Sequence, residues 1–123
     1  MLKLCMNLTD WKHTRSFQIY KILIIKPDST VLRVESNDKE LRKWLGGGWL
    51  EQITLSDELV AYVDEDGISK GLEYNARATN FVVKELGKER TLMGEIRGNM
   101  IVAGQIYGDD GFELCDVPPN LKV

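Results

Sequence analysis

The 123-residue chain has little of the material that metal or nucleophilic chemistry requires, with one histidine and two cysteines. A structural zinc site takes three or four His, Cys or acidic ligands, and Cys5 and Cys115 lie near opposite ends of the sequence. His13 stands in an irregular stretch, with no pattern that pairs it with a nucleophile. We therefore expect two reduced thiols, no metal, no cofactor and no catalytic residue.

No charge of one sign dominates, because 16 basic and 19 acidic residues leave a formal net charge of −3. Nucleic-acid-binding domains usually carry a clear basic excess, so the composition does not favour DNA or RNA as a partner. Long apolar runs are also absent, and no stretch approaches the roughly 20 residues of a membrane span. The first ten residues do not follow a secretory pattern. These absences predict a cytoplasmic protein that binds neither nucleic acid nor membrane.

The residues that are present describe a globular domain. Hydrophobic residues make up 43% of the chain and charged residues 28%, and this length suffices for one hydrophobic core. Residues 1–16 show no clear period and are expected to form an irregular N-terminal arm. Residues 17–123 are expected to form a single domain.

The first half of that domain predicts a hairpin followed by a helix. Residues 17–26 are apolar on both alternating faces, which is typical of a central strand. The turn signal Pro27–Ser29 leads into a return strand at 31–35. Asn37 is placed to cap a helix, and the glycines at 46–48 are placed to end it.

The second half predicts two short strands, a second helix and a final strand region. The strands are expected at 50–55 and 59–63, the helix from Asn75 to Gly87, and one or two strands within 94–107. Pro118 and Pro119 indicate a loose tail. This order predicts an α+β fold, a mixed but mostly antiparallel sheet with two helices packed on one face.

Two motifs resemble ligand sites and are rejected. Asp64 and Asp66 resemble the start of a calcium loop, but Ser69 occupies the glycine position and Asn75 the bidentate glutamate position. The glycines at 46–48 follow a helix instead of leading into one, so they do not predict a phosphate loop.

The candidate binding residues are polar or aromatic side chains suited to an anionic or base-like ligand. Arginine forks suit phosphates, aromatic faces suit bases, and helix N-termini attract anions. The set is Arg15, Trp49, Asn75, Arg77, Thr79, Arg97 and Asn99. Each has a purely structural alternative: a helix cap for Asn75, a surface or ion-paired position for Arg77, and core packing for Trp49.

Several stretches together resemble a family of small proteins from phages, prophages, plasmids and their bacterial hosts, which is described as a domain of unknown function. The resemblance covers about residues 18–112, and its most specific part is Asn-x-Arg-Ala-Thr at Asn75 to Thr79. The matching stretches are Ile25–Asp28, Gly46–Trp49, Asp64–Gly67, Gly71–Thr79 and Gly98–Gly104. Glu73 departs from the pattern, where a proline is expected, and so does the N-terminal arm.

The resemblance implies a setting in mobile genetic elements and no particular activity. Our leading hypothesis is a non-enzymatic phage-type binding protein that acts in counter-defence by sequestering a small anionic, nucleotide-derived signalling molecule. We expect a homo-oligomer whose interface gathers Trp49, Arg77 and Arg97. The alternatives are a protein–protein inhibitor or adaptor that binds a host defence protein through an exposed apolar patch, and an unrecognised hydrolase.

Overall fold

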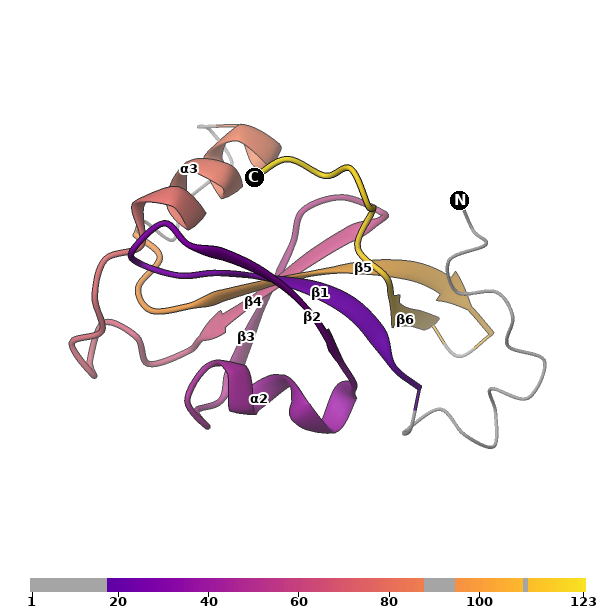
Figure 1. The fold of residues 1–123 in the computed structure, drawn as a ribbon, viewed down its shortest axis with the longest axis horizontal. Coiled ribbons are helices and arrows are strands. Elements are labelled where there is room, and N and C mark those ends of the chain that lie inside the picture. Colours follow the sequence, from indigo (N-terminus) through magenta and orange to yellow (C-terminus); the bar gives the residue numbers. More distant parts are fainter. Residues whose placement is uncertain (1–17, 88–94, 110) are drawn as a thin grey trace.

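One six-stranded antiparallel sheet organises the protein (Figure 1). The computed structural model describes residues 18–87, 95–109 and 111–123, so the predicted arm at 1–16 lies outside the described residues. The sheet order is β2-β1-β5-β4-β3, with β6 paired to β5. The strands are β1 (Tyr20–Ile25), β2 (Val31–Ser36), β3 (Leu50–Thr54), β4 (Leu59–Asp64), β5 (Met100–Gly108) and β6 (Gly111–Cys115). The helical elements are η3 (Asp38–Glu40), α2 (Leu41–Trp44) and α3 (Ala76–Leu86). The predicted α+β class is confirmed.

The last long strand, β5, lies in the middle of the sheet. Its first half is hydrogen-bonded to β1 on one side and to β4 on the other, and its second half pairs with β6. Every pairing between these strands is antiparallel, so the mixed component that we expected is not seen among the described strands.

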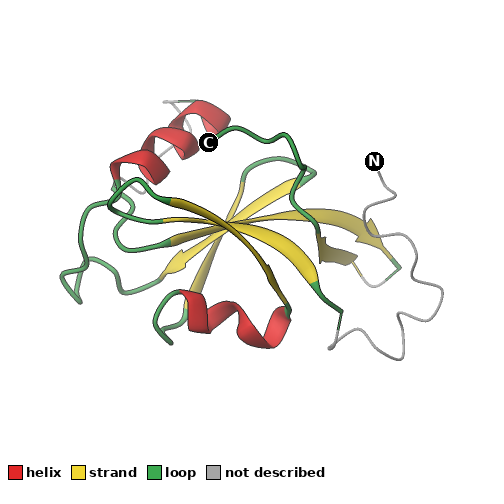
Figure 2. Ribbon diagram, viewed as in Figure 1, coloured by secondary structure: helices red, strands yellow, loops and turns green. Residues whose placement is uncertain are grey.

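The two helices pack on opposite faces of the sheet, which corrects the expectation that they share one face. In Figure 2, α3 lies on one side of the strands and α2 on the other. The reason is already visible in β1, because Ile22 and Ile24 face one way while Leu23 and Ile25 face the other. A strand that is apolar on both faces needs cover on both faces. The β2–β3 connection supplies α2, and the β4–β5 connection supplies α3.

The core therefore has two parts. The part under α3 includes Leu23, Ile25, Ile53, Leu55, Leu59, Ala61, Val63, Ala78, Phe81, Val82, Ile96, Met100, Val102 and Val117. The part under α2 includes Tyr20, Ile22, Ile24, Leu41, Leu45, Val60, Ile101 and Ala103.

The predicted helix ends are confirmed in both helical segments. The side chain of Asn37 accepts a hydrogen bond from the Glu40 N–H, and that of Asn75 accepts one from the Ala78 N–H. Gly46 follows the α2 segment and Gly87 follows α3, both with positive φ, a conformation that glycine adopts without steric cost.

The C-terminal region is more ordered than the sequence predicts. Strand β6, which begins at Gly111, was not expected. The tail after it is not loose, because Val117 is buried and its N–H donates to the Lys21 carbonyl at 2.9 Å. Leu121 and Val123 then pack against the core under α3. Pro118 and Pro119 end the strand but do not release the chain from the core.

Candidate binding site

Asn75 and Thr79 use their polar groups inside the fold. The Asn75 side chain is fully buried, and its Nδ2 donates to the carbonyl oxygens of Ile25 and Gly98, both at 2.8 Å. Thr79 Oγ1 donates to the Asn75 carbonyl and accepts from the Ile96 N–H at 2.9 Å. Together they attach the segment before β5 to the start of α3. These contacts give both residues a structural role.

Arg77 and Asn99 also bind main-chain oxygens. The Arg77 guanidinium donates to the main-chain oxygens of Ser29 at 2.7 Å and Val123 at 3.1 Å, so it joins the β1–β2 turn to the tail. Asn99 Nδ2 donates to the Trp44 carbonyl at the end of α2. Both side chains connect elements that are distant in the sequence.

Trp49 is exposed to solvent, as is Arg77. Its side chain is 64% exposed, so the core-packing alternative is wrong for this tryptophan. The Arg42 guanidinium lies over its ring at 4.4 Å from the centroid and donates to the carbonyls of Gly47 and Gly48. This cation–π contact holds the glycine joint against the end of α2. Arg15 lies outside the described residues.

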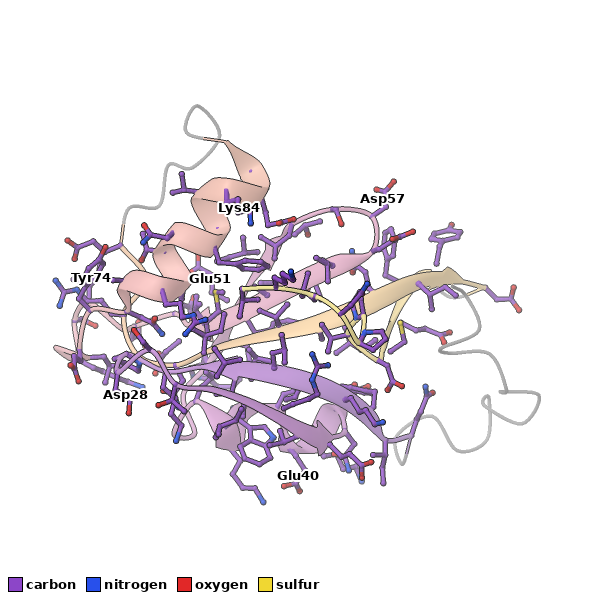
Figure 3. All side chains as sticks on the ribbon, turned by 45° about the horizontal axis from the view of Figure 1, so that its top comes forward. Asp28, Glu40, Glu51, Asp57, Tyr74 and Lys84 are labelled. Atoms are coloured by element: carbon purple, nitrogen blue, oxygen red, sulfur yellow. The ribbon has the colours of Figure 1, made fainter. Side chains whose placement is uncertain are left out.

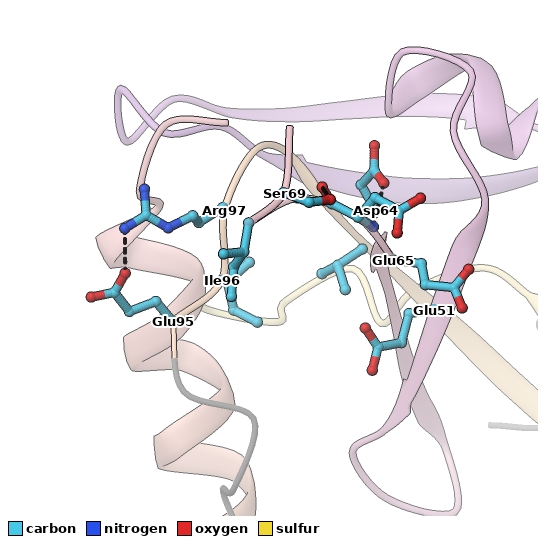
Figure 4. Close-up of a pocket in the computed structure, with 11 residues that line it drawn as sticks. Glu51, Asp64, Glu65, Ser69, Glu95, Ile96 and Arg97 are labelled. Atoms are coloured by element: carbon cyan, nitrogen blue, oxygen red, sulfur yellow. Dashed lines mark hydrogen bonds and ion pairs between the residues drawn. The ribbon is translucent and has the colours of Figure 1, made fainter. Parts of the chain in front are cut away.

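A hollow of about 340 Å³ in the described part of the chain is acidic. It lies where β3 and β4 meet the turn after β4 and the segment before β5 (Figure 4). Val63, Ile68 and Ile96 contribute apolar wall. The carboxylates that line it are Glu51, Asp64, Glu65, Asp66 and Glu95, against Arg97 as the one basic residue among the described lining residues. Of the six predicted residues that the structure describes, only Arg97 lines this hollow.

Two of the five carboxylates are already paired. Asp64 Oδ2 is 2.8 Å from Lys70 Nζ, and Glu95 Oε1 is 2.7 Å from the Arg97 guanidinium. Arg97 also donates to the Leu72 carbonyl, so its charge is directed away from a ligand. Among the described residues, Glu51, Glu65 and Asp66 have no ion-pair partner. The hollow therefore carries an excess of negative charge.

Strand pairing brings two of the unpaired carboxylates together. Glu51 lies opposite Val63 in the β3–β4 ladder, and the Glu65 N–H donates to the Trp49 carbonyl, which continues the ladder. Glu51 and Glu65 are thus diagonal neighbours on the α3 side of the sheet. Figure 4 shows them at one end of the hollow, with the Glu95–Arg97 pair at the other.

Asp64 organises the turn that forms the wall. Its Oδ1 accepts the Asp66 N–H at 2.8 Å while its Oδ2 binds Lys70. Burial alone would raise the pKa of Asp64, but the hydrogen bonds from Lys70 and Asp66 and the Lys70 charge outweigh burial and lower that pKa below its usual value. Asp64 therefore stays ionised and shapes the site, leaving the exposed glutamates to meet a ligand.

A second hollow of about 270 Å³ lies on the α2 side of the sheet, lined by amides, two tyrosines and few charges. Tyr20 donates to Asp38 at 2.5 Å, and burial followed by this contact raises the Tyr20 pKa. Burial and the charge of Asp38 raise the pKa of Tyr62 as well. Both phenols therefore stay neutral and act as hydrogen-bonding groups. Its two carboxylates, Asp38 and Glu113, give this hollow a smaller negative charge than that of the first.

Two further findings bear on the expected chemistry. Among the described residues, no group of three His, Cys, Asp or Glu side chains is arranged to hold a metal ion. None of the helices in those residues is long and apolar enough to cross a membrane. Cys115 is a free, buried thiol, and Cys5 is outside the described residues.

The acidic hollow was missed because its residues come from three separate stretches of the sequence, at Glu51, 63–69 and 95–97. In the sequence, the acids at 64–66 look like solvated turn residues, and Glu51 looks like one polar position of an alternating strand. Figure 3 labels Glu51 among the side chains of the protein. A signal was present in the alternation of β3, which places Glu51 on the same face as Ile53. Only the register with β4 places Glu65 beside it.

The fold and the hollow define a small α+β domain of antiparallel sheet between two helical layers, with an acidic recess at one end of the sheet. The chain matches the model of the family described as domain of unknown function DUF3846 over residues 20–121, and it belongs to that family. No curated protein and no solved structure matches the chain.

Proposed function

We propose that the protein is a non-enzymatic binding protein whose acidic hollow receives a basic group, a lysine or arginine side chain, from a protein partner. The observation that carries this proposal is the lining of five carboxylates against one arginine that is already paired. A cationic group entering the recess would meet Glu51 and Glu65, and apolar walls would contact its methylene stem. Charge complementarity of this kind favours association and selects the partner.

The pKa of the most buried carboxylate in the hollow favours binding over catalysis. Acid–base chemistry by two carboxylates needs environments that separate their pKa values, with one raised to hold a proton. The most buried carboxylate of the hollow, Asp64, has a lowered pKa instead. A binding role is therefore better supported than the hydrolase alternative.

Sequestration of a nucleotide-derived signal is the competing proposal, and the charge of the hollow works against it. A phosphate entering the recess would approach Glu51, Glu65 and Asp66, a like-charge arrangement that costs binding energy. The donors of Asn75, Arg77 and Asn99 are engaged with main-chain oxygens. An anionic ligand would have to displace those contacts.

We propose that the protein acts in counter-defence in the cytoplasm of a bacterial host. The resemblance of several stretches to phage and prophage proteins supports this proposal. The partner would then be a host defence protein with an exposed basic side chain. The acidic hollow indicates that this partner presents a positively charged side chain, which the family resemblance alone does not indicate.

The proposal is tested by NMR titration of the ¹⁵N-labelled protein with n-propylguanidinium, which mimics an arginine side chain. We expect shifts at Asp64–Ser69 and Glu95–Arg97, and binding weakened about two- to fivefold by Glu51→Gln or Glu65→Gln. The control Glu35→Gln removes an exposed carboxylate from β2, at the far edge of the sheet, and is expected to change nothing.

A parallel titration with ATP and a cyclic dinucleotide tests the competing proposal. Saturable shifts with a nucleotide, together with none from n-propylguanidinium, would overturn protein-side-chain binding in favour of nucleotide capture. Shifts with n-propylguanidinium that are insensitive to Glu51→Gln and Glu65→Gln would remove the hollow as the site.

A further inference from the structure

The outer edge of β3 is open along its whole length in the described structure. Strand β3 is last in the sheet order, and none of the described strands pairs with its outer side. Its residues Glu51, Gln52 and Thr54 are exposed. An unpaired strand edge is a template for another extended segment, because its N–H and C=O groups are arranged for a ladder.

The hydrogen bonds to β4 show which main-chain groups of β3 face outward. Two bonds fix the pattern, Glu65 N–H to the Trp49 carbonyl at 3.0 Å and Leu55 N–H to the Leu59 carbonyl at 3.0 Å. Because antiparallel bonds alternate along a strand, Glu51 and Ile53 also point their main-chain groups to β4. The N–H and C=O groups of Leu50, Gln52 and Thr54 therefore point outward to the open edge.

This edge borders the acidic hollow. Glu51 lines the hollow and projects from the same face as Ile53. In an added antiparallel strand, the residue opposite Glu51 would project from that face, with its Cβ about 5 Å from the Glu51 Cβ. A lysine or arginine there would pair with Glu51 and reach Glu65. The next residue on that face would lie beside the buried Ile53 and is best apolar.

We propose that the partner binds as an extended segment added antiparallel to the outer edge of β3, with a basic residue opposite Glu51 and an apolar residue opposite Ile53. This inference rests on the proposed function and names how the basic group is delivered. The main-chain bonds at Gln52 supply affinity, and the side-chain pair at Glu51 supplies selectivity. A second copy of the chain suits this edge poorly, because pairing two β3 edges would bring two acidic hollows together.

The probe is an acetylated and amidated pentapeptide, Thr-Val-Thr-Arg-Thr, whose Arg and Val fall opposite Glu51 and Ile53 when its central Thr pairs with Gln52. We expect saturable binding in ¹⁵N NMR and slower hydrogen exchange at the Gln52 and Thr54 amides. Exchange at Glu51 and Ile53, whose amides already bond to β4, is expected not to change. This alternation would not arise from a side chain docked in the hollow alone.

Two changes to the main chain test the ladder. Gln52→Pro removes the outward N–H while leaving the bonds to β4 in place, since proline is tolerated at such edge positions. We expect about tenfold weaker peptide binding, whereas the control Gln52→Thr, which keeps the N–H, retains it. N-methylation of the central Thr of the peptide removes the matching donor without touching the protein and is expected to weaken binding to a similar degree.

The outcomes separate this inference from the proposed function. Binding that survives Gln52→Pro and peptide N-methylation would overturn strand addition while the basic-group site stands. A peptide with Glu in place of Arg that binds equally well would overturn the pairing with Glu51. Absence of binding by both the peptide and n-propylguanidinium would overturn the site itself.

Discussion

At the scale of single residues, the Asn-x-Arg-Ala-Thr stretch at the start of α3 acts as a set of attachments. Asn75 joins β1 and the segment before β5, Arg77 joins the β1–β2 turn and the tail, and Thr79 holds Ile96. Ala78 is fully buried, which leaves no room for a larger side chain. The polarity of these residues suggested a ligand, but the same donors satisfy main-chain oxygens.

Asn75 is the residue whose replacement we expect to cost most in this stretch. Asn75→Ala removes a helix cap and leaves two carbonyl oxygens without their donor, so we expect a loss of about 2–4 kcal/mol in the free energy of unfolding. Asn75→Asp keeps the cap acceptor but sets a carboxylate against the carbonyls of Ile25 and Gly98, and is expected to cost at least as much. Urea denaturation measures both.

The control is Asn37→Ala, which removes a partly buried cap with no long-range partner and is expected to cost only about 1 kcal/mol. Equal losses for Asn37→Ala and Asn75→Ala would contradict the long-range role assigned to Asn75.

At the scale of elements, β5 determines the arrangement of the sheet, because it changes partners along its length. Met100–Val102 pair with β1, and from Gly104 onward the strand pairs with β6 on that same side. The change of partner from β1 to β6 occurs where the chain after β6 contacts β1. There the Lys21 N–H donates to Asp116 Oδ1. Gly104 of β5 lies at this point, directly against the main chain of Asp116.

Gly104 is required by this close approach and not by its φ angle. A Cβ added there would lie 2.3 Å from the main-chain oxygen of Asp116. We expect Gly104→Ala to lower the free energy of unfolding by about 3 kcal/mol, at the upper end for overpacking, because the main chain must move.

The control is Gly46→Ala, where φ is +89° and nothing lies within 4 Å of an added Cβ. Conformational strain alone should cost about 1 kcal/mol there. Thermal unfolding followed by circular dichroism ranks the two. A smaller loss at Gly104 than at Gly46 would show that the approach relaxes easily.

The two connections that carry the helices are the other element-scale feature. The β2–β3 connection crosses from one edge of the sheet to the other beneath the α2 face, and the β4–β5 connection returns a strand to the centre above the α3 face. This arrangement leaves β2 and β3 as outer strands. The edge at β3 carries Glu51, which links the topology to the proposed binding mode.

At the scale of the whole molecule, stability is expected to be greatest at the centre of the sheet and least at its β3 edge. Ile101 and Val102 are buried and lie between β1 and β4, so their amides should exchange with solvent only through global unfolding. The outward amides of Gln52 and Thr54 should exchange fastest among strand residues. Native-state hydrogen exchange by NMR tests this ranking. Strong protection of Gln52 in the free protein would mean that the β3 edge is already covered.

The oligomeric state belongs to the same scale. The sequence suggested a homo-oligomer whose interface gathers Trp49, Arg77 and Arg97, and this stays a prediction. The contacts of the single chain give Arg77 and Arg97 main-chain partners within the fold. An interface between copies is therefore not needed to satisfy these arginines.

Local chemistry was enough to determine the elements of this protein. The two-sided apolar pattern of β1, the turn at Pro27–Ser29 and the caps at Asn37 and Asn75 depend on hydrogen bonds and side-chain directions within a few residues, so the sequence reveals them. The α+β class follows from their order.

Only the tertiary structure decided the sheet order, the opposite faces of the helices, strand β6 and the acidic hollow. The sheet order and the acidic hollow depend on the register between segments far apart in the chain, which local patterns do not encode. The two-sided apolar β1 already required cover on both faces, and β6 forms by pairing with the neighbouring end of β5. Glu51 and Glu65 became one site only because β3 and β4 pair as they do. The scarcity of histidine and cysteine is a property of the sequence itself and does not depend on the fold. The structure adds carboxylates where an anion site was expected, and the proposed ligand changes accordingly from an anion to a cation.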